Sequence, residues 1–102
     1  GQGRGSNLNL PLQPGSGDPE FLDALERACG AVARFNPDAV VVSMGVDAGA
    51  ADPESPLRVS NEGFAAAGLR IAALGLPTVL IQEGGYHLES LGPDVMAILA
   101  AF

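Results

Sequence analysis

Two short apolar runs, each followed at once by a glycine-framed loop, most constrain the fold of this chain. One run is Val40-Val41-Val42, and the other is Thr78 to Ile81. Continuous apolar runs of this kind are typical of strands buried on both faces of a parallel sheet. The loops after them read Gly45-Val46-Asp47 and Glu83-Gly84-Gly85-Tyr86. Because ligands of open α/β sheets bind beyond the carboxyl ends of parallel strands, both loops are candidate parts of a site.

Strand and helix signals alternate along the rest of the chain. Alternating leucines predict a strand from Leu8 to Leu12. A helix is predicted from a cap at Asp18 to about Asn36, carried by apolar residues at helical spacing: Phe21, Leu25, Ala28, Cys29 and Val32. A second helix is expected between a cap at Ser60 and Gly75, and a third from Pro93 to Ala101. This order predicts an α/β fold, a partial parallel sheet with helices on both faces.

Size and composition narrow the class of protein. The 102 residues allow one domain at most, and 47% hydrophobic against 17% charged residues favour a folded interior over a disordered segment. The net charge of −7, without a basic cluster, argues against nucleic-acid binding. The apolar runs are too short to cross a membrane and no signal peptide is visible, so we expect a cytoplasmic protein. A start at Gly1-Gln2-Gly3-Arg4-Gly5 that reads as mid-loop, with so little sheet, predicts a fragment of a larger domain.

The residues of the two loops allow more than one role. Asp47 can ligate a divalent metal, but taken alone a turn-forming role explains it better. Tyr86 can donate a hydrogen bond to an oxyanion, although a loop tyrosine more often packs against its neighbours. His87 is the single histidine, and it is more readily explained as structural than as a ligand. Local spacing offers no set of three metal ligands and no Ser-His-Asp arrangement.

Four segments, taken together, indicate a protein family far more specifically than any one of them does. Asn7-Leu8-Asn9-Leu10-Pro11, Phe35 to Ser43, Gly45-Val46-Asp47 with Asp52-Pro53, and Glu83-Gly84-Gly85-Tyr86 resemble the C-terminal part of the catalytic domain of the histone deacetylase and acetylpolyamine amidohydrolase family. The similarity covers essentially all of residues 1–102, in the family's order. It implies the arginase-like three-layer α/β deacetylase fold, of which this chain supplies one part.

The resemblance also implies roles for residues of the two loops. Asp47 corresponds to a zinc ligand and Tyr86, 39 positions later, to the residue that stabilises the oxyanion. Gly84 and Gly85 correspond to the lining of a narrow substrate channel. The family's other zinc ligands, in an Asp-x-His segment, and its general-base histidines have no counterpart here, and His87 fits neither role. We therefore expect the remaining ligands upstream and no activity from this chain alone.

Glu54 is a residue that indicates the class of substrate. Family members that deacetylate polyamines resemble this chain in having glutamate after the Asp-Pro pair, and Tyr86 to Leu91 is similar to theirs as well. A carboxylate at the channel mouth would attract the distant ammonium of an acetylated polyamine. The alternative is that Glu54 only solvates a loop tip.

Three functional hypotheses follow. The first is a fragment of a zinc-dependent deacetylase that hydrolyses the acetyl-amide of small amines such as acetylpolyamines. The second is a fragment of a protein acetyl-lysine deacetylase. The third is a non-catalytic α/β interaction module that keeps the scaffold without the chemistry.

Overall fold

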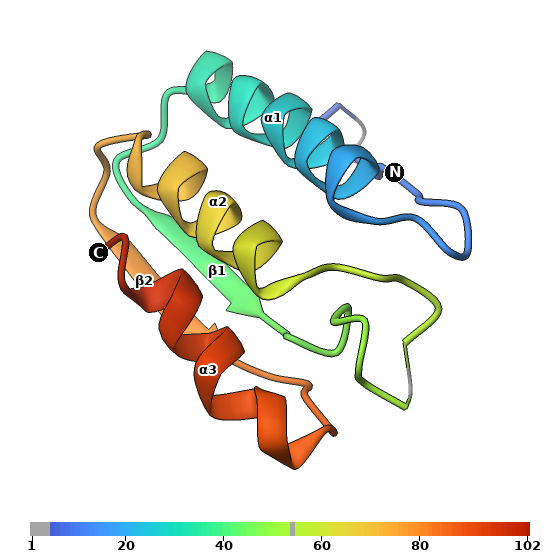
Figure 1. Cartoon of the computed structure of the whole chain (residues 1–102). Helices are drawn as coiled ribbons and strands as arrows, with labels where there is room; N and C mark the ends of the chain where they lie inside the picture. Colours follow the sequence, from blue (N-terminus) through green and yellow to red (C-terminus); the bar gives the residue numbers. More distant parts are fainter. Residues whose placement is uncertain (1–4, 54) are drawn as a thin grey trace.

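The computed structural model describes residues 5–53 and 55–102, in five elements (Figure 1). In chain order these are α1 (Asp18–Phe35), β1 (Val40–Met44), α2 (Asn61–Ala72), β2 (Thr78–Gln82) and α3 (Leu88–Leu99). β1 and β2 pair in parallel, in a register that sets Val40 opposite Thr78 and Met44 opposite Gln82. The predicted α/β class and parallel pairing are therefore confirmed. The glycine-rich start up to residue 4 lies outside the described residues, as does Glu54.

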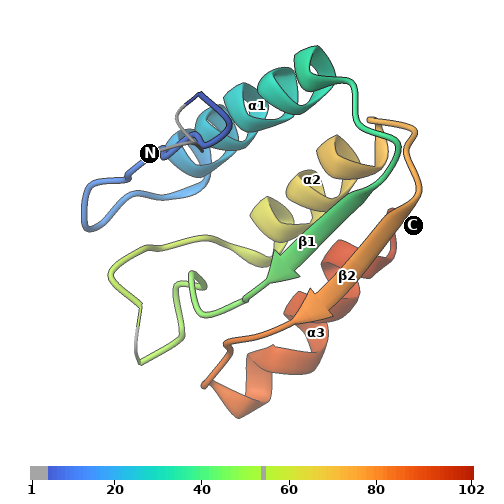
Figure 2. The ribbon, with the colours of Figure 1, turned by 180° about the vertical axis from the view of Figure 1, so that it is seen from behind.

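The three helices form one layer on one side of the sheet, as the two opposite views show (Figures 1 and 2). α2 lies in the middle of this layer and contacts both α1 and α3. The other side of the sheet is open, and Val41 there is 65% exposed, with Val79 and Ile81 also exposed. Helices on both faces, and strands buried on both faces, are thus not found among the described residues. The reason is that the β1–α2–β2 crossover sets α2 on one face, and α1 and α3 then pack against α2.

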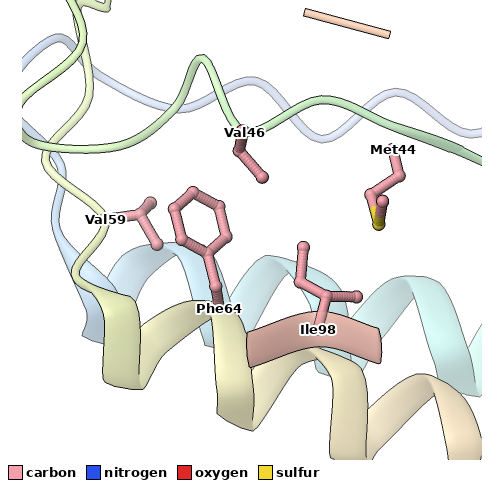
Figure 3. Close-up of a cluster of buried hydrophobic side chains, with 5 residues drawn as sticks. All are labelled: Met44, Val46, Val59, Phe64 and Ile98. Atoms are coloured by element: carbon pink, nitrogen blue, oxygen red, sulfur yellow. The ribbon is translucent and has the colours of Figure 1, made fainter. Parts of the chain in front are cut away.

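The core lies between the helix layer and the ends of the strands. Its buried side chains come from β1, the loops and two helices: Met44, Val46, Val59, Phe64 and Ile98 (Figure 3). Phe64 is the largest fully buried side chain, and its ring meets Phe21 edge to face with centroids 6.4 Å apart. Because Val46 comes from the loop after β1, the core fixes the start of that loop directly.

The predicted strand from Leu8 to Leu12 is absent. A strand needs a hydrogen-bonded neighbour, and no backbone hydrogen bond joins residues 7–12 to β1 in the described part of the chain. Residues 5–8 instead line an apolar cavity of about 460 Å³ together with α1 and the start of β1. Residues 7–13 therefore have no regular secondary structure.

Two helix starts differ from the prediction. α3 begins at Leu88, a full turn before Pro93, because the His87 carbonyl already accepts hydrogen bonds from Ser90 and Leu91 N–H. Proline favours the first turn of a helix, which is why the sequence pointed to Pro93. At α1 the cap is Gly17 rather than Asp18, since the Asp18 side chain binds Ser60 at the start of α2 instead. The predicted cap of α2 at Ser60 is confirmed, because its Oγ accepts from Gly63 N–H.

No described helix is both long and apolar enough to cross a membrane. Cys29 is half-buried on α1, and this burial, followed by the nearby Glu26 carboxylate, raises the pKa of its thiol. A raised pKa keeps the thiol protonated at neutral pH, as expected for a small packing residue rather than a nucleophile.

Candidate active site

The two glycine-framed loops are hydrogen-bonded to each other beyond the ends of the strands. Glu83 N–H donates to the Met44 carbonyl at 2.8 Å, and Val46 N–H donates to the Gly84 carbonyl at 2.9 Å. The parallel pairing of β1 and β2 therefore continues into the loops and sets Gly84 beside the residues that follow β1. The carboxyl ends of the strands meet at one edge, as the sequence predicted.

The first loop is also braced from its other side. Val59 N–H donates to the Ala48 carbonyl at 3.0 Å, and Ala50 N–H donates to the Val59 carbonyl at 2.9 Å. Gly49 N–H closes a turn onto the Val46 carbonyl at 3.1 Å. The backbone around Asp47 is thus held by the core below, by the second loop and by the segment that leads into α2.

Asp47 places its carboxylate in a gap that two glycines leave open. A Cβ on Gly84 would lie 2.8 Å from Asp47 Cγ, and a Cβ on Gly45 would lie 2.7 Å from Asp47 Oδ1. Real Cβ atoms do not come this close to another heavy atom. The carboxylate can occupy this position only because neither neighbour has a side chain.

The Asp47 carboxylate makes no hydrogen bond or ion pair in the part of the chain that the structure describes. A turn-forming aspartate normally accepts hydrogen bonds from nearby backbone N–H groups, so this alternative role gains no support. The half-buried carboxylate keeps its oxygens available for a cation. Its chemistry and its open cradle fit a zinc ligand.

The described residues contain no group of three histidines, cysteines, aspartates or glutamates that could hold a metal. Since a protein zinc site takes at least three such ligands, Asp47 can supply only one of them. His87 is the residue before the first turn of α3, and its Nδ1 lies 3.0 Å from Ser90 Oγ. The structural role predicted for His87 agrees with this position.

Tyr86 follows Gly84 and Gly85 and is 56% exposed, so it is not a packing residue of the described core. Gly85 has a φ of +153°, a conformation that L-residues rarely adopt. A Cβ on Gly85 would lie 2.6 Å from Leu91 Cδ1 and 2.8 Å from Val46 Cγ2. Gly85 therefore lets the chain turn tightly over the core and deliver Tyr86 to the same edge as Asp47.

Asp52 is a residue of this site for which the sequence suggested no role. Its side chain is buried at 7% exposure, and its Oδ2 accepts a hydrogen bond from Tyr86 N–H at 2.6 Å. The sequence signal was the Asp52-Pro53 pair in the first loop, but its partner lies 34 positions away and local patterns cannot identify it. The predicted substrate contact of Glu54, the next residue but one, lies outside the described residues.

Comparisons with known proteins match the whole chain to one protein family. The family model described as the histone deacetylase domain matches residues 1–102. The acetylpolyamine amidohydrolase of Burkholderia pseudomallei and acetylpolyamine amidohydrolase 1 of Pseudomonas aeruginosa are each 43% identical over the whole chain, which spans 30% of their length. A crystal structure of acetylpolyamine aminohydrolase from Burkholderia pseudomallei superposes with a TM-score of 0.95 at 43% identity, over all of this chain and 30% of that one.

A family match over the full length, together with this structural agreement, establishes the arginase-like deacetylase fold for the part that is present. The chain belongs to the histone deacetylase domain family.

Proposed function

We propose that these residues form the C-terminal portion of the catalytic domain of a zinc-dependent deacetylase that acts on small acetylated amines such as acetylpolyamines. The observation that carries the proposal is the placement of Asp47. Its unengaged carboxylate lies against Gly84, two residues before Tyr86, so that a metal ligand and an oxyanion donor share one edge of the sheet. The relatives named acetylpolyamine amidohydrolases, at 43% identity, support the choice of substrate.

Asp47 would hold the metal together with ligands from the rest of the complete protein. A bound zinc ion supplies Lewis acidity toward an amide carbonyl and toward water. Asp47 contributes a negative charge and a fixed direction of approach, because its cradle and its braced backbone leave it little freedom. A general base outside the described residues would accept the proton of the attacking water.

Tyr86 would act on the other side of the reacting carbonyl. As water adds to the acetyl carbon, the carbonyl oxygen becomes negative, and the Tyr86 O–H donates a hydrogen bond to it. Gly84 and Gly85 present backbone alone at this point, so the acetylated arm of a substrate can pass close to the loop. When the C–N bond breaks, the leaving nitrogen takes the proton that the general base accepted, and acetate and a free amine result.

Glu54 would distinguish small polyamines from protein substrates. It follows Asp52 and Pro53 in the loop that carries Asp47, and its carboxylate would attract the second ammonium group of an acetylated diamine. If the site instead serves acetyl-lysine in proteins, that attraction would bring no advantage. The two substrate classes can therefore be separated by direct competition.

The test is acetate release by the complete protein from an N-acetylated diamine and from an acetyl-lysine peptide. We expect a higher kcat/KM for the diamine. Tyr86→Phe removes the oxyanion donor and should lower kcat by about 10²–10³-fold. Leu88→Ala is the control, since Leu88 is exposed in the same segment and should leave kcat unchanged.

Each part of the proposal can fail separately in this assay. A preference for the peptide would make the protein an acetyl-lysine deacetylase. Near-normal turnover by Tyr86→Phe would remove Tyr86 from the chemistry. Release of acetate from neither substrate would overturn the deacetylase assignment and favour a non-catalytic module.

A further inference from the structure

We propose that Asp52 is a positioning residue, which holds Tyr86 in its catalytic place by accepting the hydrogen bond of the Tyr86 backbone N–H. This inference rests on the proposed role of Tyr86 and adds a residue whose part in the reaction is indirect. Asp52 would not touch the substrate, because it is buried and its Oδ2 binds the main chain of the second loop.

The contact has the features of a strong anchor. Asp52 Oδ2 lies 2.6 Å from Tyr86 N, and its side chain is 7% exposed. A carboxylate that accepts a hydrogen bond away from water is a stronger acceptor than a neutral oxygen. A bond of this kind would fix the backbone of Tyr86 at the residue itself.

Asp52 is itself held on both sides of its own backbone. Its N–H donates to the Gly49 carbonyl at 3.0 Å, and its carbonyl accepts from Ser55 N–H at 3.2 Å. Gly49 in turn bonds to Val46, which belongs to the buried core. The carboxylate therefore extends from a well-braced turn.

Tyr86 needs such an anchor because the chain is bonded on either side of it, at Gly84 and at His87, but packing does not hold its own side chain. Its side chain is 56% exposed, so packing within the described residues contributes little. The two residues before it are glycines, which have the greatest backbone freedom of all residues. Without a fixed point at Tyr86, the phenol could take many positions relative to the reacting carbonyl.

The anchor also links the two halves of the proposed chemistry. Asp47, the proposed metal ligand, and Asp52, which binds Tyr86, lie in the same loop. The separation between the proposed metal ligand and the proposed oxyanion donor is thus set by two bonds between the loops, from Val46 N–H to the Gly84 carbonyl and from Tyr86 N–H to Asp52. A misplacement of about 1 Å in such an arrangement can cost about 10²-fold in rate.

The test is a double-mutant cycle of Asp52→Ala and Tyr86→Phe in the complete protein. Asp52→Ala should lower kcat by about 10²-fold and change KM by less than about threefold. With Tyr86→Phe already present, the added loss from Asp52→Ala should be less than about threefold, because the donor to be positioned is gone. Asp52→Asn keeps a side-chain oxygen acceptor and should stay within about tenfold of the wild-type kcat.

Asp94→Ala is the matched control. Asp94 is also an aspartate at 7% exposure, but its Oδ1 accepts from Asn61 Nδ2 at 3.0 Å, and it lies in α3. Its removal should lower stability and leave kcat within about threefold. Equal losses of kcat in Asp94→Ala and Asp52→Ala, or fully additive losses in the cycle, would reduce Asp52 to a stabilising residue and overturn the proposal.

Crystal structures of the wild-type and Asp52→Ala proteins separate this inference from the proposed function. We expect the wild type to show the bond from Tyr86 N–H to Asp52, and the variant to show a displaced or poorly ordered residue 86. An unchanged Tyr86 in the variant would overturn the positioning role, even in an active enzyme. A displaced Tyr86 in a protein without deacetylase activity would support the anchor and refute only the proposed function.

Discussion

The Asp47 carboxylate can take its position because residue 84 is a glycine, which has a hydrogen atom where alanine would have a methyl group. A methyl group there would lie 2.8 Å from Asp47 Cγ and 2.9 Å from Oδ2. We therefore expect Gly84→Ala to push the carboxylate aside and to weaken zinc binding by about 10–100-fold, as disturbances next to a metal ligand typically do. A metal-competition titration of the complete protein measures this.

Gly92→Ala is the matched control, because it makes the same change at a position where a Cβ meets nothing within 4 Å. It should bind zinc as the wild type does. Equal zinc affinities for the Gly84→Ala and Gly92→Ala variants would show that the cradle around Asp47 has no bearing on the metal.

At the scale of elements, the start of α1 stabilises the start of α2. The Asp18 carboxylate accepts hydrogen bonds from Ser60 N–H, at 2.8 Å, and from Ser60 Oγ. Ser60 Oγ in turn accepts from Gly63 N–H at 3.0 Å. Since α2 follows directly on the loop with Asp47 and Asp52, the bond between Asp18 and Ser60 fixes the end of that loop.

Asp18→Ala should lower the free energy of unfolding by about 1–2 kcal/mol, the range for loss of a helix cap and its partner. The midpoint of urea unfolding measures this. Asp23→Ala is the control, since Asp23 makes only an exposed pair with Arg27 on α1 and should change stability by less than about 0.5 kcal/mol. Equal midpoint shifts in the two variants would contradict the capping role of Asp18.

Sequence patterns predicted those elements whose signals are local. Ser60 at the start of α2 and Asn36 at the end of α1 were both identified by their own residue types and neighbours. The partner of Asp18 and the anchor at Asp52 were not, because each joins residues more than 30 positions apart. The missing strand at Leu8–Leu12 has the same cause, since its pairing depends on a neighbour that the sequence cannot specify.

Local sequence patterns located the residues of the site but did not reveal the contacts between them. Glycines around Asp47 and Tyr86 marked both loops, and the family resemblance implied roles that remain predictions. The close contact of Gly84 with the Asp47 carboxylate and the unengaged oxygens of Asp47 became visible only in three dimensions. These two observations favour a ligand over a turn former, which the residue types alone could not decide.

At the scale of the whole molecule, the chain presents one covered and one open face of a two-stranded sheet. Val41, Val79 and Ile81 are exposed on the open face, and the chain spans 30% of the length of the two relatives that are 43% identical to it. With one metal ligand among its described residues, it should neither hold zinc nor turn over substrate by itself. We expect catalysis from the complete protein alone.

The zinc affinity of the complete protein with and without the Asp47 carboxylate tests most directly whether the metal binds at this edge of the sheet. Asp47→Ala removes one ligand but keeps the braced loop, so it should bind zinc at least about 100-fold more weakly than the wild type. Circular dichroism should show an unchanged fold, which separates loss of the ligand from loss of structure. Zinc bound by Asp47→Ala as tightly as by the wild type would contradict the placement of the metal at this edge of the sheet.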